Sequence, residues 1–128
     1  MTTYYDEELA AKGREIQGKL WGNLAAGGGG GMAGAELAPD FFKLVQQFCF
    51  GMFWGREELD IKYRSLVTVS QLAALGKYEE LKGHLRGALN VGWTKEELIE
   101  VMMQTAVYCG VPAGVNALNA AAEVLKDA

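Results

Sequence analysis

The most informative part of this chain is residues 80–112, ELKGHLRGALNVGWTKEELIEVMMQTAVYCGVP. Its first half places one apolar stripe at helical spacing, which is typical of a helix face that packs on a core. That stripe consists of Leu81, His84, Leu85, Ala88 and Leu89. The second half opens on Thr94-x-x-Glu97, a capping box in which two side chains satisfy free backbone amides at a helix start. The stretch therefore predicts two helices, over about 78–91 and 94–109.

The same periodicity extends outward in both directions and predicts helices over about 5–21, 39–53, 59–75 and 112–126. Strand signals are nearly absent, so the fold class is all-α, with about six helices. A run of five glycines, Gly27 to Gly31, has high backbone entropy and predicts a mobile linker over 27–34. We therefore divide the chain into an N-terminal helix with its linker, 1–34, and a helical domain, 35–128.

Length and charge narrow the function classes. A chain of 128 residues is expected to form one domain, and its net charge of −4 argues against a nucleic-acid partner. The charged N-terminus lacks an apolar signal core, and no apolar run is long enough for a membrane span, so we expect a cytoplasmic protein. Cys49 and Cys109 form no C-x-x-C motif and are expected to be reduced thiols.

His84 is the only histidine, and two interpretations of it stay open. Glu80 lies four residues earlier, so the two side chains can meet on adjacent helical turns. A neighbouring carboxylate fixes the tautomer of an imidazole and raises its pKa, which suits proton transfer near neutral pH. The alternative is a core histidine that is bonded to a neighbouring glutamate or carbonyl.

Three further residues are candidates for a binding site, each with a structural alternative. Arg64 can bind a carboxylate in a bidentate manner, or it can form a surface ion pair with Asp60. Trp54, beside a glycine, is either a core residue or the cap of a cavity. Tyr108 either satisfies a neighbour's backbone or lines a pocket. One histidine and two distant cysteines predict no metal site.

The helix over 94–109 is unusually apolar in its second half, from Val101 to Cys109. A helix that is apolar on all sides is usually enclosed on all sides. In a domain of this size, enclosure predicts either a central position in a bundle or a subunit interface.

Five short motifs in order resemble the carboxymuconolactone decarboxylase family. They are W-x-R at Trp54, R-S-L at Arg64, E-L-x-x-H at 80–84, G-x-T-x-E-E at 92–97 and Y-C-G-V-P at 108–112. The resemblance covers about residues 41–125. It implies the all-α alkylhydroperoxidase D-like fold for 35–128 and assembly as a homo-oligomer, a trimer or a hexamer.

The resemblance also implies an activity. The namesake enzyme removes CO2 from 4-carboxymuconolactone in the β-ketoadipate route of aromatic breakdown, and it needs no cofactor because the lactone's conjugated carbonyl accepts the electrons. Carried over to this chain, His84 is the proton donor or electrophile and Glu80 orients it. Arg64 binds a substrate carboxylate, and Tyr108 and Trp54 line the pocket. The expected partner is a small carboxylated molecule, with 4-carboxymuconolactone or a related lactone as the substrate.

Two alternatives remain. The related peroxidase branch carries C-x-x-C-x-x-x-H, but Lys77 and Glu80 occupy the two cysteine positions here. A thiol-dependent antioxidant would therefore have to use Cys49 and Cys109 instead. A non-catalytic ligand-binding homologue is the third hypothesis, and a sealed space around His84 would favour it.

Overall fold

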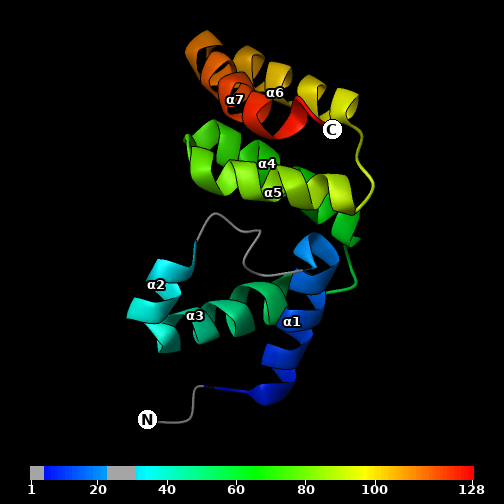
Figure 1. The fold of residues 1–128 in the computed structure, drawn as a ribbon. Helices are drawn as coiled ribbons and strands as arrows, with labels where there is room; N and C mark the ends of the chain where they lie inside the picture. Colours follow the sequence, from blue (N-terminus) through cyan, green and yellow to red (C-terminus); the bar gives the residue numbers. More distant parts are fainter. Residues whose placement is uncertain (1–4, 23–30) are drawn as a thin grey trace.

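Helices stack in three layers in the computed structural model, which describes residues 5–22 and 31–128 (Figure 1). One layer holds α6 and α7, the next α4 and α5, and the last α1 with α3. The elements are α1 (Glu7–Trp21), α2 (Gly31–Leu37), α3 (Pro39–Val45), the π-helix η2 (Gln46–Phe53), α4 (Ile61–Leu75), α5 (Tyr78–Asn90), α6 (Lys95–Cys109) and α7 (Val111–Leu125). The described ranges contain no strand, so the all-α prediction is confirmed for them.

Two features differ from the predicted set of helices. The helix predicted over 39–53 is α3 running directly into η2, where the amide of Trp54 donates to the carbonyl of Cys49, five residues back, at 2.9 Å. The linker predicted over 27–34 is wrong for its last residues, because α2 begins at Gly31. Good helix formers at 35–37 follow those glycines, and α2 packs on α3. Residues 27–30 lie outside the described ranges.

The helix boundaries around α5 follow from local side-chain chemistry. Gly76 ends α4 in the left-handed region at φ 72°, which glycine adopts without a Cβ clash. The predicted capping box at the start of α6 is confirmed: the Glu97 amide donates to the Thr94 hydroxyl at 3.1 Å, and the Thr94 amide donates to the Glu97 carboxylate at 3.0 Å. Gly76 therefore fixes where α4 ends, and the capping box fixes where α6 begins. Helix α5 lies between these two points in the sequence.

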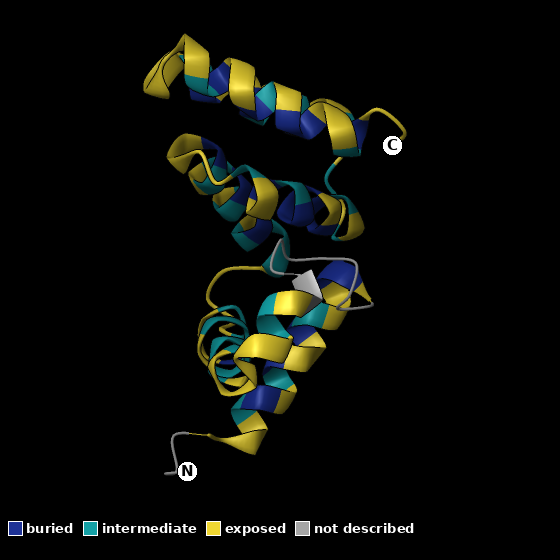
Figure 2. Ribbon diagram, turned by 60° about the vertical axis from the view of Figure 1, so that its left-hand side comes forward, coloured by how far each residue is buried: buried dark blue, intermediate teal, exposed yellow. Residues whose placement is uncertain are grey.

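Two hydrophobic clusters meet at α5. The larger one fills the bundle of α4 to α7, and its fully buried members include Val69, Leu81, Leu85, Leu98 and Met102. The smaller one is formed by three residues of α1, namely Ile16, Leu20 and Trp21. Four partly buried residues pack against it: Phe50, Trp54, Ile61 and Val91. Figure 2 shows the buried residues on the inward faces of the helices, as the predicted α5 stripe requires. Helix α5 thus contributes to one core and borders the other.

Close packing of α1 on η2 depends on two glycines. A Cβ at Gly13 would overlap the carbonyl oxygen of Gln46, and a Cβ at Gly51 would overlap that of Leu9. Both obstacles are backbone atoms, which cannot rotate away as a side chain can. Glycine at these positions therefore sets the distance between α1 and η2, and with it the position of Trp54 at the end of η2.

Helix α6 is not central in the bundle. Its inner face buries Leu98, Met102 and Thr105, but its other side leaves Val107 71% exposed and Tyr108 81% exposed. The central-position interpretation is therefore wrong for the single chain, and large apolar side chains remain exposed on the outer face of α6. Among the described residues, no helix combines the length and apolar content that crossing a membrane requires.

Candidate functional site

His84 lies between two indole rings. The spacing of the α5 stripe turns its side chain inward, and the residue is only 8% exposed. The Trp54 ring stacks on the imidazole with centroids 5.8 Å apart and planes at 22°, and the Trp21 ring meets it edge-on at 5.1 Å and 70°. Trp21 comes from α1 and Trp54 from the end of η2, so three elements build this aromatic site.

The imidazole is neutral at physiological pH. Burial lowers the pKa of His84 from 6.5 to about 4, and the negative charge of Glu80 opposes that shift without cancelling it. The predicted net rise in the pKa is therefore wrong, because removal from water outweighs the carboxylate. The Nδ1 atom is buried and has no hydrogen-bond partner among the residues that the structure describes. A neutral imidazole with an unused buried nitrogen is unusual in a core, because buried polar atoms are normally paired.

Glu80 lies one turn before His84 on α5, as the sequence spacing requires. Its side chain is exposed, and it forms no hydrogen bond to the imidazole. Its influence on His84 is electrostatic. The orienting role inferred from the family resemblance thus has no hydrogen bond behind it in this chain.

Arg64 and Trp54 line one pocket of about 190 Å³ at the junction of η2 and α4. The other lining residues are Phe53, Leu59, Val67, Thr68 and Gln71. Among the described lining residues, Arg64 is the only charged one, so the pocket favours an anion. The His84 ring does not line it but stacks directly against the Trp54 ring. Trp54 therefore stands between the pocket and the imidazole.

The Arg64 guanidinium is partly engaged by backbone. Its Nε donates to the Leu59 carbonyl at 3.1 Å, and Nη2 donates to the Arg56 carbonyl at 3.3 Å. A guanidinium has five N–H donors, so three are left for a ligand. The Asp60–Arg64 ion pair that was one alternative is not formed; Asp60 instead caps α4 by accepting from the Lys62 amide at 2.9 Å.

Tyr108 lines a second and larger pocket of about 430 Å³ between α4 and α6. Val101 and Gln104, on the same stripe of α6, line it as well. Val67 and Gln71 border both pockets, so the two hollows adjoin along α4. The structure thus brings Trp54 and Arg64 together in one pocket, leaves His84 behind the Trp54 ring, and places Tyr108 of α6 in the adjoining pocket.

The two cysteines are separate free thiols, Cys49 in η2 and Cys109 at the end of α6. Burial raises the pKa of Cys49, which disfavours its reactive thiolate form. In residues 5–22 and 31–128, no three side chains of the His, Cys, Asp or Glu type form a group that could hold a metal ion.

Trp21 was not among the residues singled out from the sequence. It closes an amphipathic helix and looks there like any core aromatic residue. Its contact with His84 joins segments far apart in the chain, and no motif or spacing signals such a contact. Only the packing of α1 on α5 brings the two side chains together.

Comparison with known proteins supplies the family. The sequence profile of the carboxymuconolactone decarboxylase family matches residues 39–123. The chain belongs to this family. Within the family, it is 43% identical over 92 residues to a 4-carboxymuconolactone decarboxylase of Acinetobacter baylyi, across 72% of this chain and 69% of that protein. Residues 39–123, which the family profile matches, include Trp54, Arg64 and His84 but exclude Trp21.

Two other family relatives extend the comparison. One is the nitrosuccinic acid decarboxylase npaB of Metarhizium robertsii, 35% identical over 85 residues, which cover 66% of this chain and 59% of that protein. The other is an uncharacterized 15.0 kDa protein of Paracoccus denitrificans, 34% identical over 94 residues, which cover 72% of this chain and 70% of that one. The similarity to two proteins named as decarboxylases supports a decarboxylase of this family.

Proposed function

We propose that this protein is a cofactor-independent decarboxylase of 4-carboxymuconolactone or a related carboxylated lactone, acting at His84. The observation that carries the proposal is the neutral imidazole held between two indoles, with Nδ1 buried and unpaired. Family membership supplies the reaction class. The site supplies a residue suited to it. The enclosed position of His84 favours the alternative of a non-catalytic ligand-binding homologue, so the activity of His84→Ala is the deciding test.

The chemistry shared by the two named relatives narrows the substrate class. In both a carboxylated lactone and nitrosuccinic acid, the carbanion left by CO2 can be delocalised onto an electron-withdrawing group, a carbonyl or a nitro group. The bond between carbon and carboxylate breaks, its electron pair moves onto oxygen, CO2 leaves, and a proton then adds to carbon. No electron carrier enters this balance. The protein has to orient the carboxylate and stabilise the oxyanion.

His84 suits the second task in its neutral form. A neutral imidazole has one N–H donor and one acceptor nitrogen, so it can donate a hydrogen bond to the developing oxyanion. The surrounding indoles keep water away, and a hydrogen bond to a charged oxygen is stronger in such a medium. Of the two roles inferred for His84, the electrophile therefore fits its lowered pKa better than the imidazolium proton donor.

Arg64 suits the first task. Its guanidinium is the positive charge of the pocket that Trp54 also lines, and it retains free donors for a substrate carboxylate. Because the Trp54 ring stands between that pocket and His84, it would have to move aside for the oxyanion to reach the imidazole. Glu80 would modulate the imidazole electrostatically, and Tyr108 would act from the adjoining pocket.

We also propose that the protein works as a homo-oligomer, a trimer or a hexamer. Large apolar side chains are exposed along the end of α6 and the start of α7: Met103, Val107, Tyr108, Val111 and Val115. A contiguous exposed apolar surface is typical of an interaction site.

The thiol-dependent alternative has less support, because Cys49 is held as a thiol and Cys109 lies in a different layer of the fold.

The test is release of CO2 from 4-carboxymuconolactone and, separately, from nitrosuccinic acid. We expect the wild type to decarboxylate one of them and His84→Ala to lose at least about a hundredfold in kcat, the usual size of an acid–base or oxyanion contribution. Arg86→Ala, an exposed position on the same helix, is the matched control. Circular dichroism must show that both variants fold. Full activity in folded His84→Ala would remove the histidine from the mechanism.

A further inference from the structure

Trp21, at the end of α1, is hydrogen-bonded to α5. Its indole Nε1 donates to the carbonyl of Gly83 at 2.8 Å in a buried hydrogen bond. Gly83 is the residue directly before His84, so this bond ties the indole to the backbone that carries the imidazole. Beside it, the side-chain amide of Asn90 donates from Nδ2 to the Leu20 carbonyl at 2.6 Å. Two hydrogen bonds thus fasten the end of α1 to α5.

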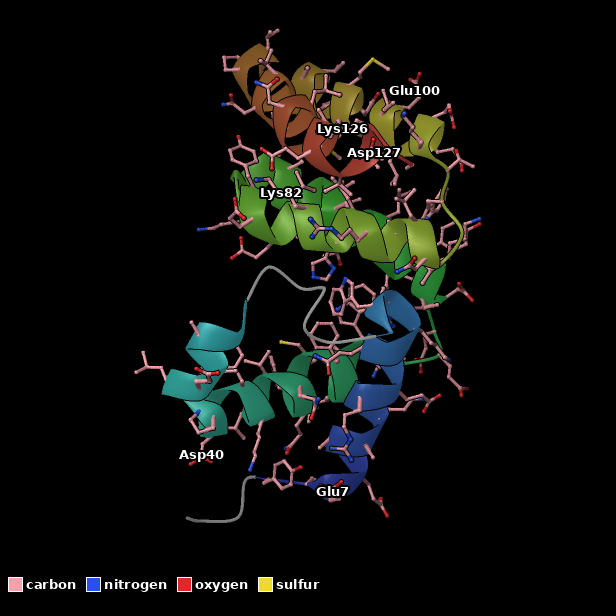
Figure 3. All side chains as sticks on the ribbon, in the orientation of Figure 1. Glu7, Asp40, Lys82, Glu100, Lys126 and Asp127 are labelled. Atoms are coloured by element: carbon pink, nitrogen blue, oxygen red, sulfur yellow. The ribbon has the colours of Figure 1, made fainter. Side chains whose placement is uncertain are left out.

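The surface of α5 is shaped to accept this indole. At Gly87, one turn after Gly83, an added Cβ would lie 3.3 Å from Trp21 Nε1 and 3.2 Å from Leu20 Cδ2. These distances are tighter than ordinary van der Waals contact, so a side chain there would require Leu20 and Trp21 to shift by a few tenths of an ångström. With Gly83 and Gly87 both free of side chains, the indole lies flush against α5 and its edge reaches His84. Figure 3 shows side chains filling the space between α5 and α1.

We propose that Trp21 is a positioning residue for His84, one that holds the plane of the imidazole and excludes water from it. The geometry supports this role: the edge-on ring contact, the bond to the preceding carbonyl and the buried Nδ1, which has no hydrogen-bond partner among the described residues. Its consequence for activity rests on the proposed decarboxylase function. Because Trp21 lies outside the matched residues 39–123, α1 adds to the His84 site from beyond the family region.

The pKa of His84 reports on the groups that surround its imidazole. Glu80 on α5 is the charged group that acts on its pKa, and the partners from α1 and η2 are the uncharged rings of Trp21 and Trp54. Removing the Trp21 ring therefore changes the burial of the imidazole and leaves its charged neighbour in place. The chain has a single histidine, so one NMR titration curve reports on this site alone.

The experiment compares Trp21→Ala and Trp21→Phe with the wild type by NMR titration of the His84 ring protons. Water that enters the space left by Trp21→Ala should raise the pKa of His84 by about one unit or more toward its ordinary value. Trp21→Phe keeps an aromatic ring but loses the bond to Gly83, so it should give a smaller rise. The kcat for CO2 release should fall about tenfold in Trp21→Ala with KM little changed.

Trp93→Phe is the matched control. Its indole Nε1 also donates to a backbone carbonyl, that of Lys62 at 2.7 Å, but its ring contacts Tyr63 and not His84. We expect it to leave the pKa of His84 unchanged. An unchanged pKa in folded Trp21→Ala, or an equal shift in Trp93→Phe, would overturn the inference. If the pKa shifts as expected while the wild type releases no CO2, the positioning role stands and the decarboxylase proposal fails.

Discussion

A single side chain, His84, carries the proposed chemistry, and its environment governs its charge. Two indoles remove it from water, and that effect exceeds the attraction of Glu80. The sequence shows that Glu80 lies four residues before His84. It does not show that Trp21 and Trp54 contact the imidazole, and Trp21 comes from a helix far away in the chain. The sign of the pKa shift was therefore beyond sequence reasoning, although the inward orientation of His84 was not.

The first prediction concerns stability against pH. With a pKa of 6.5 in the unfolded chain and about 4 in the folded one, the unfolded state binds a proton between these values and the native state does not. Acidification across this window should therefore lower the free energy of unfolding, by about 3 kcal/mol from this group. Urea unfolding of the wild type and His84→Phe between pH 4 and 7 measures it. If both proteins lose stability equally, the pKa of His84 is not depressed.

Arg64 gives a second prediction at this scale. Arg64→Gln removes the positive charge of the pocket, so KM for a carboxylated substrate should rise about tenfold or more, because charge-assisted pairs are the strong ones. Steady-state kinetics measure the change. Arg64→Lys should recover part of the loss, since it restores the charge without the planar fork. A KM that is the same in all three proteins would exclude Arg64 from substrate binding.

At the level of helices, boundaries set by local chemistry were predictable and those set by tertiary packing were not. The α5 stripe and the capping box of Thr94 and Glu97 rest on neighbours within one or two turns, and both are confirmed. The π-helical turns of η2 and the start of α2 at Gly31 carry no local signal of that kind. The same limit applies to the candidate site. Trp54 and Arg64 lie in short motifs and were singled out from the sequence, whereas the contact of Trp21 with His84 depends on tertiary packing and was not predicted.

Two glycines on α1 test how closely it packs on η2. Gly13→Ala places a methyl group against the Gln46 carbonyl and should destabilise the fold by about 1–3 kcal/mol, the usual cost of overpacking. Gly18→Ala meets nothing within 4 Å and should stabilise it by up to about 1 kcal/mol through helix propensity. Chemical denaturation measures both. Equal effects of the two substitutions would mean that α1 is not held at this distance.

For the whole molecule, the apolar outer face of α6 and α7 predicts self-association. Val107 is 71% exposed in the single chain, a poor position for a large apolar side chain unless another surface covers it. Light scattering after size exclusion should give a mass well above the 13.9 kDa of one chain. Val107→Glu should shift that mass toward the monomer, and Val107→Ile should not. A monomeric wild type would contradict the proposed assembly.

The pH dependence of kcat/KM for CO2 release tests the central claim most directly, namely that a neutral His84 carries the reaction. With its pKa at about 4, the imidazole is already neutral at pH 5.5. We expect a rate that is flat from about pH 5.5 to 8 in the wild type and strongly reduced across that range in His84→Ala. A rate that falls as pH rises through about 6.5 would mean that the imidazolium is required and that a neutral His84 does not carry the reaction.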